Sequence, residues 1–321
     1  MTGIEYRFIE TNGIRVRVAE QGRGPLVVLL HGFLNYSYSW RHQLRALAEA
    51  GYRAVAPDLR GYGGTDRPAD PGQYTQLHLA GDIVGLIDAY GSESAVVAGH
   101  DWGAMVAWTT ALLRPDRVRG VVGMSVPYVP RGRDSLLTMM RDRFGERHYI
   151  QYFQQSGPAE AELSADIAAT FRGVFHSGSG AAQTFWNPVL APGGRWLDAH
   201  PDPGTLPRWL PQADLDAYVA TFSSTGFTGG LNYYRAIDAS WALMGAWTGA
   251  KIAVPAMFLY GDRDSFGNYA SDLIDALPEH VPHLRETLVL TGCGHWVQQE
   301  QPREVSDALV RFAHAMYPQR S

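Results

Sequence analysis

The stretch that decides the fold is Ala95-Val96-Val97-Ala98-Gly99-His100-Asp101-Trp102-Gly103. Its first four residues are apolar and end at a glycine, as expected for a strand buried on both faces of a sheet. A helical pattern follows over 102–114, so the segment predicts a strand, a tight turn and a helix. Asp101 stands in the turn, where its carboxylate would be presented at the edge of the sheet.

The same alternation of short apolar runs and amphipathic segments extends outward from this stretch. The predicted strands of the first 130 residues are Leu26–Leu30, Arg53–Ala56, Ala95–Ala98 and Val118–Ser125. Helical patterns separate them over 39–50, 76–90 and 102–114, and Asn12-Gly13 predicts a hairpin before them. Repeated strand and helix predict an α/β fold whose mostly parallel central sheet carries helices on both faces.

The rhythm stops after Pro130 and returns near Ile252, with strands at Ala256–Tyr260 and Thr287–Leu290 and helices near 268–277 and 303–316. Between these points the chain shows helical patterns rich in aromatic residues, broken by a Gly- and Pro-rich connection over 188–207. We therefore predict three segments. Residues 1–130 form the first part of the core, 131–245 a mainly helical cap, and 246–321 the second part of the core.

Composition excludes several classes of protein. Hydrophobic residues make up 45% of the 321 residues and charged residues 18%, so a large core can form and a disordered chain is excluded. The net charge of −5, without a basic block, argues against nucleic-acid partners. The single cysteine, Cys293, excludes an internal disulfide and a cysteine-based zinc site. No secretory leader or long apolar run is visible, which predicts a cytoplasmic protein without membrane association.

The turn at Asp101 has the form of a nucleophile elbow, in which glycines flank one exposed side chain. The usual serine is replaced by aspartate, and this changes the chemistry. A carboxylate is ionised at neutral pH and can attack a saturated carbon directly, leaving an alkyl ester that water must cleave. The structural alternative is that Asp101 only caps the helix that follows it.

A water-activating pair is expected from two later loops. His295 lies in Gly292-Cys293-Gly294-His295-Trp296 after a predicted strand, and Asp264 follows the strand that ends at Tyr260. Nucleophile, acid and histidine then occur in the chain order of the α/β-hydrolase catalytic triad. Asp264 is preferred to Asp262, which could instead cap a turn.

The loop His31-Gly32-Phe33-Leu34 ends another predicted strand. A backbone N–H there can pair with the N–H after the nucleophile to hold an oxyanion, which makes Phe33 and Trp102 the expected donors. The alternative for Phe33 is packing under the cap.

Taken together, these motifs resemble the soluble epoxide hydrolases, the Asp-nucleophile branch of the α/β-hydrolase fold. The resemblance runs nearly end to end and rests on HGF at 31–33, YSWR at 38–41, GYGGTDRP at 61–68, GHDWGA at 99–104, YFQQ at 152–155, GFTGGLNYYR at 226–235 and GCGHWVQQEQP at 292–302. It implies that Asp101 attacks an epoxide, that Asp264 and His295 activate water, and that two cap tyrosines protonate the opening ring.

By residue match these tyrosines are Tyr152 and Tyr234, with Tyr149 and Tyr233 as the alternatives in register. The resemblance also implies a small-molecule epoxide as the partner, no metal or organic cofactor, a role in detoxification and a possible homodimer. Phe153, Trp186 and Trp296 are expected to contact substrate.

The sequence departs from the family pattern after Phe33, where proline is usual and this chain has Leu34. Either the loop is built differently or packing absorbs the cost of the family's conformation. Two other functions stay open. One is haloalkane dehalogenation by the same aspartate, for which Trp186 or Trp241 would have to bind halide, and the other is a non-catalytic binding protein on the same fold.

Overall fold

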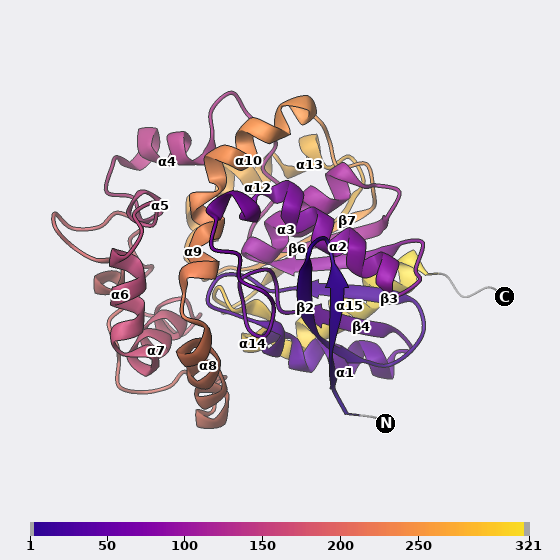
Figure 1. Cartoon of the computed structure of the whole chain (residues 1–321), viewed down its shortest axis with the longest axis horizontal. Coiled ribbons are helices and arrows are strands. Elements are labelled where there is room, and N and C mark those ends of the chain that lie inside the picture. The colour runs from indigo at the N-terminus through magenta and orange to yellow at the C-terminus, as the bar shows by residue number, and fades with distance from the viewer. Residues whose placement is uncertain (1–2, 318–321) are drawn as a thin grey trace.

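The computed structural model describes residues 3–317, and within them eight strands form a single sheet in the order β1-β2-β4-β3-β5-β6-β7-β8 (Figure 1). The strands are β1 (Glu5–Thr11), β2 (Ile14–Gln21), β3 (Leu26–Leu30), β4 (Arg53–Pro57), β5 (Ala95–His100), β6 (Val118–Met124), β7 (Ala256–Gly261) and β8 (Leu284–Leu290). β2 is antiparallel to β1 and β4, and the other neighbours pair in parallel. The mostly parallel α/β sheet and the Asn12-Gly13 hairpin are confirmed.

Helices cover both faces of this sheet. The core helices are α1 (Arg41–Glu49), α2 (Gln76–Ala89), α3 (Trp102–Leu113), α11 (Ser265–Tyr269), α12 (Ser271–Asp275), α13 (Leu277–His280), α14 (Val297–Glu300) and α15 (Pro302–Met316), with 3-10 turns η1 (Ser37–Trp40) and η2 (Pro71–Tyr74). α2 packs beside α3, and α1 packs beside α15. The helix predicted near 268–277 is two short helices, α11 and α12.

The central strands show why the sheet is buried on both sides. All five residues of β3 are buried, and alternate residues belong to different clusters of apolar side chains. Val28 and Leu30 join the cluster that contains the side chains of α2 and α3, whereas Val27 and Leu29 join the cluster of α1 and α15. Successive side chains of a strand point to opposite faces, so one continuous apolar run supplies both cores.

The chain leaves the sheet after β6 and returns at the neighbouring strand β7. The helices between them are α4 (Leu136–Phe144), α5 (Tyr149–Tyr152), α6 (Pro158–Ala165), α7 (Ile167–Ser177), α8 (Gln212–Thr225), α9 (Thr228–Arg235) and α10 (Ile237–Leu243), with 3-10 turns η3 (Trp196–Ala199) and η4 (Met244–Trp247). Helices α4 to α8 gather on one side of the sheet-containing body (Figure 1). We call the segment from α4 to η4 the lid, and keep 131–245 as the proposed extent of the cap unit.

Candidate active site

Asp101 lies in a strained turn between β5 and α3. Its backbone has φ 54° and ψ −122°, a conformation that non-glycine residues rarely adopt and that costs about 1–3 kcal/mol. The flanking glycines make the turn possible, because a Cβ on Gly99 would lie 2.0 Å from the Gly103 carbonyl oxygen. The same atom on Gly103 would lie 2.2 Å from the Leu30 carbonyl oxygen. The turn therefore places its backbone strain at Asp101 and presents the carboxylate of this residue at the end of β5.

The two expected oxyanion donors lie at this carboxylate. The N–H of Phe33 donates to Asp101 Oδ1 at 2.7 Å, and the N–H of Trp102 is a second backbone donor. Gly32 lets the loop come this close, since a Cβ there would lie 2.4 Å from Asp101 Oδ1. Burial raises the pKa of Asp101, while His295 and these two donors act in the opposite direction.

The loop that holds Phe33 is built around a left-handed residue. Leu34 has φ 57°, and no cis peptide bond occurs within residues 3–317. A proline ring fixes φ near −65°, so the observed loop is not one that proline could complete without rearrangement. Of the two explanations left open by the sequence, the loop is built differently, and Phe33 still donates to Asp101.

His295 stands between two carboxylates. Its Nδ1 lies 3.1 Å from Asp264 Oδ2, and its Nε2 lies 3.7 Å from Asp101 Oδ2. Burial acts to lower the pKa of His295, but the charges of Asp264 and Asp101 outweigh it and raise the pKa to about 9. Asp264 is buried, whereas Asp262 is exposed and accepts from the N–H of Gly292 at 2.7 Å. The structure thus brings Asp264, not Asp262, to His295.

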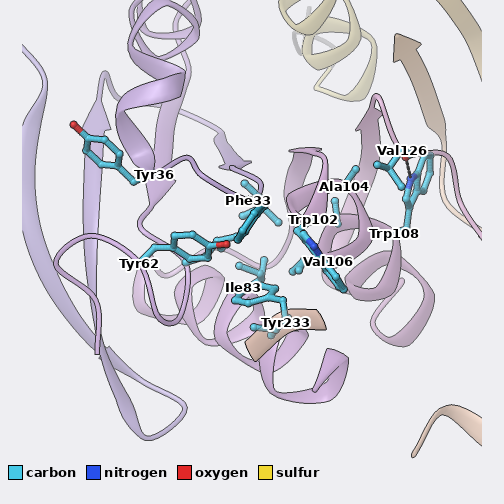
Figure 2. Close-up of a cluster of buried hydrophobic side chains, with 14 of the residues drawn as sticks. Phe33, Tyr36, Tyr62, Ile83, Trp102, Ala104, Val106, Trp108, Val126 and Tyr233 are labelled. Atoms are coloured by element: carbon cyan, nitrogen blue, oxygen red, sulfur yellow. Dashed lines mark hydrogen bonds between the residues drawn. The ribbon is translucent and has the colours of Figure 1, made fainter. Parts of the chain in front are cut away.

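Tyr234 belongs to the lid helix α9 and lines the same cavity as Asp101. Its ring centroid lies 5.0 Å from that of Trp102 and 5.2 Å from that of Phe33, and it is buried. Figure 2 shows Phe33 and Trp102 in a cluster of buried side chains that also contains Tyr62 and Tyr233. Tyr233 points into the core instead, where its hydroxyl donates to the Arg60 carbonyl oxygen at 2.9 Å.

The structure corrects the expectation for Tyr152. Its hydroxyl donates to Glu162 Oε2 at 2.6 Å on the side of α6, and it does not line the cavity in front of Asp101. Tyr149 lines this cavity instead, with its ring centroid 6.1 Å from that of Tyr234, and burial together with the charge of Asp101 raises the pKa of its hydroxyl. Tyr149 and Tyr152 are only three residues apart on the one-turn helix α5, yet Tyr149 lines the cavity and Tyr152 binds Glu162.

A cavity of about 240 Å³ opens in front of Asp101. Apart from the tyrosines its wall is mainly apolar, and it includes Met105, Leu112, Met139, Met140, Trp186 and Met244. Trp186 is therefore in position to contact substrate. Phe153 and Trp296 are not part of the wall: both are buried behind it, Phe153 against Tyr234 and Trp296 against His295. The expectation of substrate contact is corrected for these two residues.

One of the two candidate halide donors already has another hydrogen-bond partner. The indole N–H of Trp241, one candidate donor, is already directed to the Gly132 carbonyl oxygen at 3.2 Å.

Among residues 3–317 there is no cluster of three or more His, Cys, Asp or Glu side chains placed to hold a metal ion. Over the same residues no helix has the length and apolar character needed to cross a membrane.

Sequence reasoning assigned no role to two lid-contacting carboxylates, Glu162 and Glu300. Glu162 accepts from Tyr152 and from the N–H of Leu197, and so joins α5, α6 and η3. Glu300 accepts four hydrogen bonds around His295. Glu162 stands in no quoted motif. Glu300 lies within GCGHWVQQEQP at 292–302, but that motif does not indicate its role, because Ser179 and Gly180 are more than a hundred residues away in sequence.

Comparison with known proteins agrees with this geometry. Residues 25–157 match the family model described as the alpha/beta hydrolase fold. Epoxide hydrolase 3 of Siraitia grosvenorii is 44% identical over 95% of this chain and 97% of its own length. Epoxide hydrolase A of Mycobacterium tuberculosis is also 44% identical, over 95% of this chain and 96% of its own.

Solved structures give the same result. An epoxide hydrolase from an endophytic Streptomyces superposes with a TM-score of 0.94 at 42% identity, over 99% of this chain and 97% of that one. Epoxide hydrolase A from Mycobacterium thermoresistibile superposes with a TM-score of 0.90 at 45% identity, over 96% and 98% of the two chains. Fold, elbow and full-length similarity lead to one conclusion: the chain belongs to the epoxide hydrolase family of the α/β-hydrolase fold.

Proposed function

We propose that this chain converts an epoxide and water into a vicinal diol through an ester on Asp101. The observation that carries the proposal is the position of this carboxylate. The N–H of Phe33 holds Asp101 Oδ1, His295 approaches Oδ2, and a largely apolar cavity opens in front of the carboxylate. An aspartate that only capped α3 would need none of these surroundings, and its side chain makes no hydrogen bond that caps the helix.

Ring opening is the first step. Asp101 Oδ2, which the N–H of Phe33 does not hold, attacks an epoxide carbon and displaces the ring oxygen. The developing alkoxide takes a proton from a tyrosine hydroxyl. Tyr149 and Tyr234 are the proposed donors, because both line the cavity beside Asp101. Burial raises the pKa of both hydroxyls, so both are protonated at neutral pH and able to donate.

Ester hydrolysis is the second step, and the first step prepares it. Esterification removes the negative charge of Asp101, one of the charges that raise the pKa of His295. His295 can then give its proton to the tyrosinate left by ring opening and, as a neutral imidazole, take one from water, while Asp264 holds its ring. Water attacks the Asp101 carbonyl carbon, and the oxyanion forms on Oδ1 between the N–H groups of Phe33 and Trp102. Collapse of this intermediate breaks the bond between the Asp101 carbonyl carbon and Oδ2. The departing diol oxygen takes a proton from His295, and the Asp101 carboxyl group then gives its own proton to His295.

A pair of turnover assays tests the proposal. Purified enzyme is given styrene oxide with detection of the diol, and separately 1,2-dibromoethane with detection of bromide. We expect diol without bromide. In a His295→Gln variant, mass spectrometry should find one epoxide mass added to the protein, because alkylation continues and release stops. Release of bromide without diol, or an unmodified His295→Gln protein, would overturn the scheme.

The proposal also covers the kind of substrate, the cap unit, the oligomeric state and the location in the cell. The mainly apolar wall supports a substrate with an apolar or aryl substituent, and the lid supports a cap unit over 131–245. A homodimer is tested by sedimentation of the purified protein. A cytoplasmic location is tested by fractionation of the source cells.

A further inference from the structure

Glu300 is a carboxylate that the two-step scheme leaves unused. It ends the short helix α14, and its side chain folds back to the residues on both sides of His295. Its Oε1 accepts from the N–H of Trp296 at 3.1 Å, and its Oε2 accepts from the N–H of Gly294 at 3.2 Å. One side chain thus holds the backbone immediately before and after the histidine.

The same carboxylate also holds the lid. Glu300 Oε2 accepts from the N–H of Gly180 at 2.8 Å and from the hydroxyl of Ser179 at 3.2 Å, two residues that follow α7. The histidine backbone adds a direct link, because the N–H of His295 donates to the Gly178 carbonyl oxygen at 2.7 Å. Three consecutive N–H groups of the histidine loop therefore end on Glu300 or on the lid segment that Glu300 binds.

Close packing of backbone against backbone supports a fixed relation between these two segments. A Cβ on Gly180 would lie 2.1 Å from the Gly292 carbonyl oxygen, and one on Gly294 would lie 2.3 Å from the Gly178 carbonyl oxygen. Only glycine permits this approach. On its other side the His295 carbonyl accepts from His100 Nε2 at 2.7 Å, so the loop is held between the core and the lid.

We propose that Glu300 is a positioning residue for ester hydrolysis, which fixes the His295 backbone to the lid segment Ser179–Gly180. The inference rests on the proposed function, because it concerns the step that uses His295. Ring opening depends on Asp101 and the cavity tyrosines, which Glu300 does not touch. Loss of Glu300 should therefore slow the second step and spare the first. A displacement of about 1 Å at a reacting group can cost roughly 10²-fold in rate.

The test separates the two steps in single-turnover experiments with styrene oxide, with the ester counted by mass spectrometry of acid-quenched samples. Glu300→Gln keeps one acceptor oxygen and places an amide against N–H donors. We expect ester formation within about twofold of wild type, hydrolysis slower by roughly 10²-fold, and accumulation of the ester. Glu300→Asp keeps the charge and both oxygens but is one methylene shorter, so it should restore part of the lost rate. Glu304→Gln, the same change at an exposed site on α15, is the matched control and should behave as wild type.

Each outcome decides the question. Hydrolysis at the wild-type rate in Glu300→Gln, or an equal loss in both steps, would overturn the positioning role. If Glu300→Gln does not fold, Glu300→Asp is read in the same way: a loss confined to hydrolysis supports the role, and an equal loss in both steps overturns it. A wild-type enzyme that forms neither ester nor diol would instead refute the proposed function, and this inference with it.

Discussion

The choice between Tyr149 and Tyr152 can be decided by one pair of substitutions. Tyr149→Phe removes a hydroxyl that lines the cavity beside Tyr234, whereas Tyr152→Phe removes one that donates to Glu162 outside the cavity. The two changes delete the same atom from the same four-residue helix, so each is the control for the other.

The expected magnitudes follow from these surroundings. Loss of one preorganised donor to a developing oxyanion typically costs about 10²–10³-fold in rate. Because Tyr234 still reaches the same oxygen, we expect the lower end for Tyr149→Phe, about 10²-fold or 2.7 kcal/mol in the barrier to ring opening. For Tyr152→Phe we expect ring opening within about twofold. This variant should instead lose stability: its free energy of unfolding should be lower by about 1.5–3 kcal/mol, since the carboxylate of Glu162 loses a hydrogen bond.

Stopped-flow alkylation by styrene oxide measures the first quantity, and urea unfolding measures the second. The double variant Tyr149→Phe/Tyr234→Phe should lose nearly all alkylation. The two side chains lie side by side in the cavity wall and are proposed to serve the same oxygen, so the effects of the two single substitutions need not multiply. An alkylation rate that falls about 10²-fold in Tyr152→Phe and stays normal in Tyr149→Phe would refute our assignment and restore the one based on sequence.

Three other predictions concern the histidine pair and the loop at Leu34. The pKa of His295 is raised from its ordinary 6.5 to about 9, so its stabilising charge is fully present below the lower value and is lost as pH rises through the higher one. The difference in unfolding free energy between wild type and His295→Gln should therefore shrink over that interval, as measured by urea unfolding at several pH values; a constant difference would contradict the shift. Asp264→Asn should slow ester hydrolysis by about 10²–10⁴-fold in single-turnover assays, while Asp262→Asn, the neighbouring control, changes it little. At Leu34 the positive φ should make a Gly variant at least as stable as an Ala variant in thermal unfolding, the reverse of the usual order.

Local sequence was sufficient for the elements that position the nucleophile and the histidine. The apolar run of β5 and the glycines around Asp101 predict the turn, because strand, sharp turn and helix are each determined by neighbouring residues. The helical lid could be located for the same reason, from the loss of the strand rhythm after Pro130. The distance past the strand end favours Asp264 over Asp262, and the structure brings Asp264 to His295.

Sequence was insufficient where the direction of a side chain depends on distant partners. Tyr149 and Tyr152 belong to a helix of four residues, too short for a periodic pattern that would show which side faces the cavity. The carboxylate of Glu162 determines the direction of the Tyr152 side chain, because it accepts a hydrogen bond from the Tyr152 hydroxyl outside the cavity. The backbone of Leu34 was equally unpredictable from local sequence, since nothing in the neighbouring residues indicates a positive φ at a buried leucine.

Glu162 and Glu300 extend this argument from single residues to the alignment of the lid. Each stands in a helix, where glutamate is common and usually solvated, yet each accepts one backbone N–H from a segment remote in sequence. Glu162 binds η3, whose Trp196 packs on Phe153 and Phe33, and Glu300 binds the turn after α7 to the histidine loop. The nucleophile is therefore specified by a contiguous motif, whereas its alignment with the lid depends on carboxylates that bind segments remote in sequence. Substitutions at these carboxylates should alter the rates of individual steps while the triad itself stays intact.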